Sequence, residues 1–319
     1  MSKNPKIAIL GSLNYDCVIY GKSLPHKGET VIGNSSGFFF GGKGANQAVQ
    51  AARLGADVHF IGKVGKDDVG SKMIASLKKE GITTTHITVD DSTTSGTCAI
   101  FVDENGDNAL MVAPNANLRV TKDDIDAAMS VIRKCDIFIA QLEVSIEAIE
   151  YAIMQAYKAG VTVILNPAPA NKISADVFQF VDFLTPNETE AQFYADILPD
   201  AADKGTCIRA AEKLLSFGVE KVIITLGAAG SFYADNENHF LVKAFKVDAV
   251  DATAAGDAFN AGVAYKLGQG VNIKEAIVFG NAVGAVAASK KGAQSSLAKL
   301  DHIEMFIEKN KNEDKVKKG

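Results

Sequence analysis

The chain has 319 residues, 47% apolar and 22% charged, a globular composition long enough for one large α/β domain or two small ones. Its net charge of −5 and pI near 5.6 argue against a nucleic-acid partner, which calls for a basic surface. No apolar run approaches the ~18 residues of a membrane span, and four cysteines without a C-x-x-C pair predict a cytoplasmic protein away from membranes.

The first 115 residues predict one strand of a core and several short strands of another kind. Residues 7–10 are too short for the core of a signal peptide and are followed at once by Asn14 and Asp16, so we expect a first strand. Residues 44–54 are expected to be helical, and 57–61 to return to the core. Short segments rich in β-formers predict a small sheet that forms a lid over a site: residues 17–20, 30–32, 37–40, 97–102 and 109–112.

From about residue 130 onward, strands and helices alternate. Residues 145–159 predict a helix that Ser145 caps and Gly160 stops. The strands are continuous apolar runs, namely residues 136–140, 161–165, 183–185 and 221–225. Because such strands are buried on both faces, they predict a three-layer α/β/α core with a mostly parallel central sheet.

We expect one domain over residues 1–305, with lid strands drawn from about 14–43 and 93–113. Residues 306–319 form a charged tail, which we expect to be frayed from residue 308 to residue 319.

The segment 251–260 carries the strongest chemical signal. Small residues at 254–256 allow a tight turn into a helix that starts near Asp257 and runs to about Leu267. Free N–H groups at the start of a helix suit an anion such as a phosphoryl group in transfer, and Asp257 can accept a proton from an attacking hydroxyl. Alternatively Asp257 only caps the helix, since aspartate is among the preferred cap residues.

The glycine-rich segment 37–47 begins like a P-loop. Gly37, Gly42 and Lys43 have the required spacing, but Gly44 stands where Ser or Thr should hold Mg²⁺, which argues against a P-loop. Glycines beside Lys43 and Asn46 equally suit close backbone approach to a hydroxylated ligand, or a simple strand-to-helix turn.

Polar residues also follow other predicted strands. Asn14 and Asp16 can grip adjacent hydroxyls or form an Asx-turn, because ligands bind beyond the carboxyl ends of parallel strands. Glu190 and its neighbours either complement a helix dipole or hold Mg²⁺ through water. Residues 225–230 form a Gly-bounded turn that suits nucleotide phosphates or a plain hairpin, and a lone Glu143 ends another strand.

In chain order these segments resemble the ribokinase-like carbohydrate and nucleoside kinases. The motifs that carry the resemblance are residues 41–47, 166–169, 185–190, 251–257 and 291–294. The resemblance implies a ribokinase-like α/β fold and ATP-dependent phosphorylation of D-ribose to D-ribose 5-phosphate. It leaves open a related pentose or nucleoside, such as deoxyribose, and a non-catalytic sugar-binding relative.

The resemblance also implies roles for single residues. It makes Asp257 the general base, with an anion hole of backbone N–H groups from Ala254, Ala255 and Gly256. The sugar site it implies consists of Asn14, Asp16, Gly42, Lys43, Asn46, Glu143 and Asp257. The ATP site it implies consists of Asn187, Glu190, Thr225, Gly227, Gly230, Gly256 and Asn281, with Mg²⁺ near Glu190.

A monovalent cation, usually K⁺, and a dimer are implied in the same way. The matching cation positions are Asp251, Thr253, Ala287, Lys290, Gly292 and Ser296. Ala252 and Ser295 depart from the family pattern, which often has a hydroxyl residue and a proline there. Because relatives pair two subunits through the lid, the resemblance implies a homodimer.

Overall fold

The structure, a computed structural model, describes residues 4–316 and their side chains up to residue 311. Its core is a large sheet. Among the described residues, nine strands form it, in the spatial order β13 (His239–Val242), β12 (Ser231–Ala234), β11 (Lys221–Thr225), β10 (Phe183–Leu184), β9 (Thr162–Leu165), β8 (Ile137–Ala140), β1 (Lys6–Leu10), β4 (Asp57–Gly65) and β5 (Thr83–Asp90). β11, β12 and β13 pair antiparallel at one edge and the other pairs are parallel, so the predicted mostly parallel sheet is confirmed.

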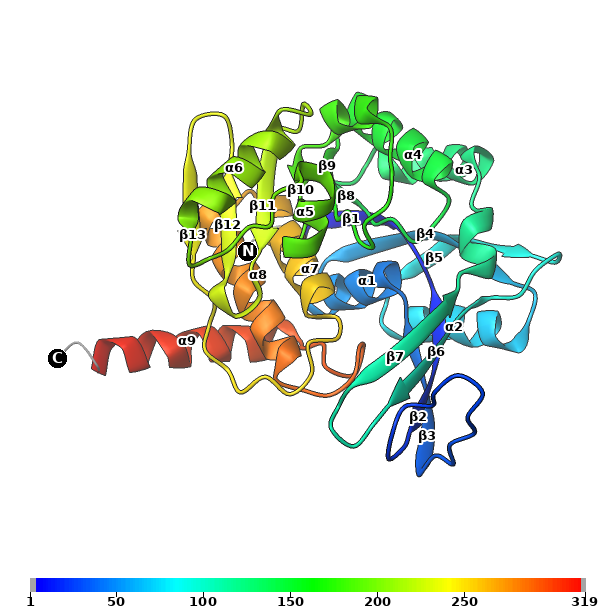
Figure 1. Cartoon of the computed structure of the whole chain (residues 1–319). Coiled ribbons are helices and arrows are strands. Elements are labelled where there is room, and N and C mark those ends of the chain that lie inside the picture. The colour runs from blue at the N-terminus through cyan, green and yellow to red at the C-terminus, as the bar shows by residue number, and fades with distance from the viewer. Residues whose placement is uncertain (1–3, 317–319) are drawn as a thin grey trace.

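Helices cover both faces of this sheet (Figure 1). One face carries α1 (Lys43–Arg53), α2 (Asp68–Lys79), α7 (Ala255–Gly268), α8 (Ile273–Ala288) and α9 (Leu300–Val316), and the other carries α3 (Lys122–Ile132), α4 (Ile146–Lys158), α5 (Glu188–Ala195) and α6 (Lys204–Leu215). Successive residues of β1 supply both layers, since Ile7 and Ile9 join one core cluster and Ala8 and Leu10 the other. A strand buried on both faces must be apolar throughout, which is why its sequence does not alternate.

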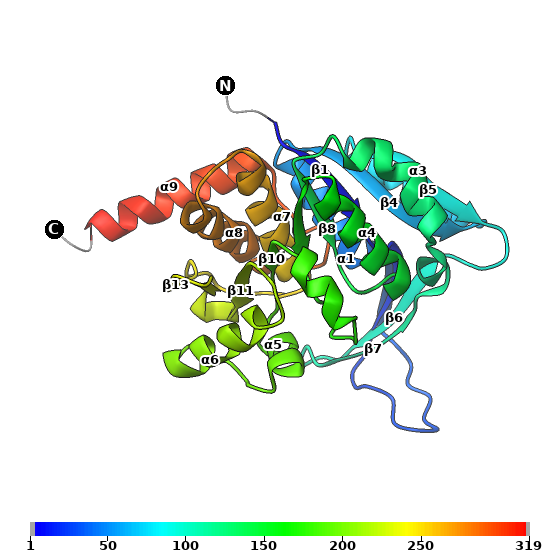
Figure 2. The same cartoon turned by 90° about the horizontal axis from the view of Figure 1, so that it is seen from above.

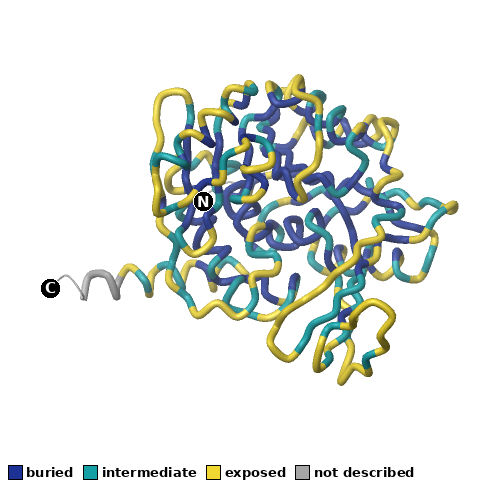
Figure 3. The backbone as a smooth tube through the Cα atoms, viewed as in Figure 1, coloured by how far each residue is buried: buried dark blue, intermediate teal, exposed yellow. Residues whose placement is uncertain are grey.

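A smaller sheet projects from this core (Figure 2). Within the described chain it has four strands, in the order β3 (Ser35–Gly41), β2 (Asn14–Tyr20), β6 (Gly96–Val102) and β7 (Asn108–Ala113). The expected strand at residues 30–32 is wrong: this segment is a loop in which Ile32 is 87% exposed. It is short and pairs with no neighbouring strand among the described residues, so its β-forming residues have no ladder to join. Figure 3 shows the exposed loop and sheet beside the buried core.

Both ends of α4 lie where the sequence predicted them, whereas the C-terminal tail differs from its prediction. α4 has Ser145 at its N-cap position, without a side-chain hydrogen bond, and Gly160 follows its end with φ of 76°. The tail expected to fray is instead helical through Val316. Before this segment, Phe306 of α9 packs against Phe245 with ring centroids 5.4 Å apart. Residues 317–319 of that tail lie outside the described residues. No helix in the part of the chain that is described is long and apolar enough to cross a membrane.

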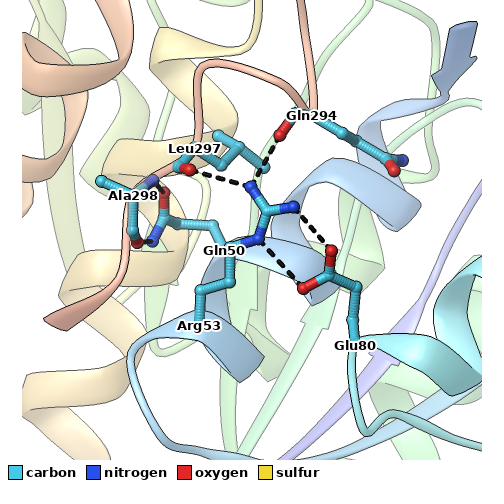
Figure 4. Close-up of polar contacts among 6 residues, drawn as sticks. All are labelled: Gln50, Arg53, Glu80, Gln294, Leu297 and Ala298. Carbon is cyan, nitrogen blue, oxygen red and sulfur yellow. Dashed lines mark hydrogen bonds and ion pairs between the residues drawn. The ribbon is translucent and has the colours of Figure 1, made fainter.

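The C-terminal half of α1 is bound to the segment before α9 (Figure 4). Arg53 pairs with both carboxylate oxygens of Glu80 at 2.6 and 3.0 Å, and its Nη1 donates to the carbonyls of Gln294 and Leu297 at 2.7 and 2.8 Å. Gln50 donates to the carbonyl of Ala298 at 2.9 Å. These bonds fix the C-terminal half of α1 against the segment before α9.

Candidate active site

The start of α7 is an open helix N-terminus. Small residues allow this turn: Ala254 sits at the N-cap with φ of 60°, in the left-handed region that few residues other than glycine adopt. No side chain caps the helix, and a Cβ added at Gly256 would meet no atom within 4 Å. The space beside Gly256 is therefore open, as an anion-binding helix terminus requires, whereas the N–H of Ala255 donates to the carbonyl of Ala252 at 3.1 Å.

Asp257 lies in the first turn of α7 and does not cap it. The helix begins at Ala255, two residues earlier than the sequence predicted, and the cap position belongs to Ala254. The Asp257 side chain is 7% exposed and accepts hydrogen bonds from Asn46 at 2.9 Å and Gln47 at 3.0 Å. Burial raises the pKa of Asp257, while the charge of Lys43 and the two amide hydrogen bonds act in the opposite direction.

Gly42 and Lys43 bring α1 against the end of β1. Gly42 has φ of 91°, and an added Cβ would lie 2.7 Å from the Ser12 carbonyl oxygen, so only glycine fits. The backbone N–H of Lys43 donates to Glu143 at 3.1 Å, and Ser12 donates to the same carboxylate oxygen at 2.5 Å. Glu143 is therefore bound to the turn and not simply solvated.

The Lys43 ammonium sits among carboxylates. Burial lowers its pKa, but the charges of Asp257, Glu143 and Glu190 outweigh burial, and the pKa of Lys43 is raised. Lys43 is therefore a permanent cation close to the proposed base.

Asn14 and Asp16 lie at the start of β2, on the lid side of the site. Asn14 is buried, and Asn117 donates to its Oδ1 at 2.9 Å, which leaves the amide group of Asn14 as a donor. Burial, with a smaller contribution from the charge of Glu143, raises the pKa of Asp16 to about 6. Because Glu143 also acts on Asp257, these residues belong to one electrostatic cluster with Asp257.

The predicted nucleotide residues fall into two groups. Asn187 caps α5 and forms a reciprocal capping box with Glu190, with bonds of 2.8 and 2.9 Å, and it bridges to Thr225 at the end of β11. Burial raises the pKa of Glu190, whose carboxylate interacts with Lys43 and Asp257. Gly227 and Gly230 bound a short 3₁₀ turn after β11, both with positive φ.

Asn281 lies apart from the first group, on α8. It accepts from Ser231 at 2.6 Å and donates to the carbonyl of Val242 at 3.2 Å. Its hydrogen bonds thus tie α8 to the β12–β13 hairpin.

The positions matched to a monovalent cation lie in two turns that contact each other. Asp251 accepts from the N–H of Thr253 at 2.9 Å and from that of Gly292 at 2.8 Å. Ala287 lies in the last turn of α8, and its carbonyl accepts from the N–H of Lys290 at 3.1 Å. Ser296 is fully buried in the same C-terminal segment. Burial alone would raise the pKa of Asp251, but the hydrogen bonds from Thr253 and Gly292 outweigh burial, and the pKa is lowered.

The structure adds polar residues to the site that the sequence analysis did not single out. Gln47 contacts Asp257, while Gln141 and Asn166 contact Gln47. Gln141 and Asn166 follow the buried strands β8 and β9, and polar residues at such strand ends were the available signal. Gln47 lies in the motif 41–47, but spacing gave it no role, because adjacent helical residues point about 100° apart and Asn46 was the residue expected to face the site.

Residues 4–300 of the chain match the model of the pfkB family of carbohydrate kinases. It is 39% identical over 302 residues to a ribokinase from Haemophilus influenzae, covering 95% of this chain and 98% of that protein. It is 35% identical over 306 residues to a deoxyribokinase from Salmonella typhi, covering 95% and 99%.

A solved ribokinase from Arabidopsis thaliana, in complex with ribose and ATP, has a similar fold. The TM-score is 0.88 at 25% identity, with 95% of this chain and 99% of that chain covered. The expected family and α/β fold class are thus confirmed. The chain belongs to the pfkB family of carbohydrate kinases, and it is an ATP-dependent sugar phosphotransferase that works with a divalent cation.

Proposed function

We propose that this kinase is a ribokinase, which transfers the γ-phosphoryl group of ATP to the primary hydroxyl of D-ribose and forms D-ribose 5-phosphate and ADP. The observation that carries the proposal is the buried Asp257 at an open helix N-terminus, beside Lys43 and Asn46. The similarity to the Haemophilus influenzae ribokinase supports ribose as the acceptor.

In the proposed reaction Asp257 removes the proton from the sugar hydroxyl as its oxygen attacks the γ-phosphorus. The bond from the γ-phosphorus to the bridging oxygen breaks, and ADP leaves with that electron pair. Backbone N–H groups of Ala254, Ala255 and Gly256 receive the charge that develops on the phosphoryl oxygens. The protein accelerates this reaction mainly by positioning the reactants and stabilising charge, because phosphoryl transfer requires no covalent bond to the protein.

The sugar site in this proposal is made of Asn14, Asp16, Gly42, Lys43, Asn46 and Glu143. Asn46 supports the assignment because its Oδ1 is buried without a hydrogen-bond partner among the described residues. A hydroxyl of the sugar would supply that missing donor.

ATP is assigned to Asn187, Glu190, Thr225, Gly227, Gly230, Gly256 and Asn281. The carboxylate of Glu190 would hold Mg²⁺ through water, and the ion would supply positive charge that offsets the charge of the phosphates. K⁺ is assigned to Asp251, Thr253, Ala287, Lys290, Gly292 and Ser296, where the carboxylate that joins the two turns and the surrounding carbonyls are oxygen donors suited to a hard cation. There K⁺ would add fixed positive charge beside the anion hole.

A homodimer through the lid, in the cytoplasm, completes the proposal. The small sheet exposes a group of large apolar side chains, which favours burial against a second copy: Phe38, Phe39, Leu110, Met111 and Val112. Phe38 is 61% exposed and Met111 77% exposed. Four free cysteines are consistent with a reducing compartment.

A coupled assay of ADP release tests the acceptor. We expect the highest kcat/KM with D-ribose, dependence on Mg²⁺, and a higher rate in K⁺ than in Na⁺. The similarity to a deoxyribokinase makes 2-deoxy-D-ribose the alternative acceptor. A higher kcat/KM for deoxyribose or a nucleoside would contradict ribose, and binding of sugar without ADP release would indicate a non-catalytic relative.

Asp16→Asn tests the sugar site through pH. If the Asp16 carboxylate accepts a sugar hydroxyl, the wild-type KM for the sugar rises as pH falls below about 6, where Asp16 becomes protonated. The variant should have a higher KM at neutral pH and lose that pH dependence. A wild-type KM that stays constant between pH 5 and pH 8 would contradict the role of Asp16.

The same variant has an expected effect on stability. The pKa of Asp16 in the folded protein lies above its ordinary value, so the ionised carboxylate destabilises the fold. The contribution of Asp16 to stability is fully present below pH 3.8 and is lost as pH rises through about 6. Asp16→Asn should therefore raise the free energy of unfolding by about 2 kcal/mol at pH 8 and change it little at pH 4. Urea denaturation measures this, with the exposed Asp91→Asn as control.

A further inference from the structure

A chain of buried amides runs beneath Asp257 and ends on its carboxylate. Gln47, on α1, is fully buried, and its Nε2 donates to Asp257 Oδ1 at 3.0 Å and to Asn166 Oδ1 at 3.1 Å. Its own Oε1 accepts from Gln141 Nε2 at 2.7 Å. One side chain of α1 is thus bonded to residues that follow β8 and β9 and to the first turn of α7.

The chemistry of these groups gives the chain a fixed direction. An ionised carboxylate only accepts hydrogen bonds, so Gln47 must turn its NH₂ toward Asp257 and its oxygen toward Gln141. Gln141 must then donate, and its Oε1 is left buried without a partner in the described part of the chain. If the amide of Gln47 were flipped, its oxygen would face the Asp257 oxygen and its NH₂ would face the NH₂ of Gln141. Neither pair can form a hydrogen bond, so the orientation of Gln47 is fixed.

The two oxygens of Asp257 consequently differ. Oδ1 is held by Gln47, which has no exposed surface. Oδ2 accepts from Asn46 at 2.9 Å, and Asn46 also carries the unpartnered Oδ1 assigned to the sugar. The sugar hydroxyl therefore approaches the base from the Oδ2 side.

We propose that Gln47 is a positioning residue that binds Oδ1 of Asp257, locked in place by Gln141 and Asn166, so that Oδ2 receives the proton from the acceptor hydroxyl. The inference rests on the proposed role of Asp257 as the base. It assigns a task to a side chain that touches neither sugar nor ATP.

The charges around Asp257 set the expected pH effect. Lys43 on α1 lowers the pKa of Asp257, Glu143 after β8 raises it, and Glu190 on α5 interacts with the same group. Burial raises this pKa most, and the hydrogen bond from Gln47 lowers it. Loss of that hydrogen bond should thus leave Asp257 protonated to a higher pH.

Gln47→Met, of similar length but without a donor, tests the proposal through the pH profile of kcat/KM. We expect the acidic limb of the profile to move to higher pH by about one unit, because a hydrogen bond to the charged form is lost. The KM for ATP should change less than about threefold, since Gln47 lies on the sugar side of the base.

Gln50→Met is the matched control. Gln50 is equally buried one turn further along α1, but its amide bonds to Ala298 and not to the base. It should lower the melting temperature without moving the acidic limb. An acidic limb of Gln47→Met that coincides with the wild type, or an equal shift in Gln50→Met, would overturn the proposal.

A second variant covers the case in which Gln47→Met does not fold. Gln141→Met leaves the bond from Gln47 to Asp257 but removes the donor that orients it. The acidic limb should then shift in the same direction by a smaller amount, and an unshifted limb contradicts the proposal. A wild-type protein that phosphorylates no sugar would instead contradict the proposed function, before any variant is compared.

Discussion

Asp257→Asn is expected to lower kcat by about 10²–10⁴-fold, the contribution of a general base, while the Kd of the sugar changes less than about threefold. Asparagine has the same shape, so the acceptor hydroxyl still reaches the site, but its amide cannot take the proton at any working pH. The anion hole and the bound phosphates remain, which leaves a residual rate. Coupled ADP release measures kcat, and calorimetry measures sugar binding.

The control for this variant is Asp301→Asn, at the exposed start of α9, which removes one carboxylate without touching the site. It should keep wild-type kcat. If Asp257→Asn retained more than about a tenth of wild-type kcat, another group would be the base, because a lost base costs at least 10²-fold. Loss of sugar binding in parallel with kcat would make Asp257 a binding residue instead.

The layered core could be predicted from the sequence because burial on both faces constrains every residue of a strand. Residues 7–10 are apolar without alternation, and the structure uses them alternately for the two layers of β1. The strand predicted at residues 30–32 was wrong, because β-propensity favours a strand only where a neighbouring strand can pair with it. This segment has no such neighbour in the described structure.

The start of α7 shows the limit of local rules. Aspartate is a favoured cap, and Ala254 in a left-handed conformation is not a cap that propensity would choose. Burial of Asp257 against Asn46 and Gln47 overrides this preference and frees the carboxylate for another task. The role of Glu190 was ambiguous for a different reason, since a carboxylate that complements the helix dipole and one that holds Mg²⁺ through water occupy the same place. The structure places Glu190 in a capping box with Asn187, which neither alternative predicted.

The polar network around Asp257 could not be predicted from the spacing of residues in the sequence. Gln47, Gln141 and Asn166 are far apart in the chain and meet only because α1 packs across the carboxyl ends of β8 and β9. Gln47 belongs to the motif 41–47 and Gln50 does not, but helical spacing alone does not show that Gln47 faces Asp257 and Gln50 the segment before α9.

Gly44→Ser has the second large expected effect, and it separates two interpretations of the glycine-rich segment. A serine at residue 44 would complete the P-loop pattern with Gly37, Gly42 and Lys43, so a P-loop NTPase should gain Mg²⁺-dependent ATP hydrolysis. The structure predicts the opposite. A Cβ at residue 44 would lie 2.6 Å from the Cα of Gly11 and 2.7 Å from the Ser12 nitrogen, both backbone atoms that cannot turn away.

The clash must push the start of α1 away from β1, and α1 carries the contacts of Asn46 and Gln47 with Asp257. We expect kcat/KM for the sugar to fall about 10²-fold, as displacement of about 1 Å does in oriented sites, and the free energy of unfolding to fall by about 1–3 kcal/mol. Ala52→Ser, which adds a hydroxyl to the partly buried end of the same helix, should change both little. ATP hydrolysis that rises in Gly44→Ser without a sugar would favour the P-loop, whereas loss of sugar phosphorylation with no such gain follows from a helix that needs glycine in order to lie against the end of β1.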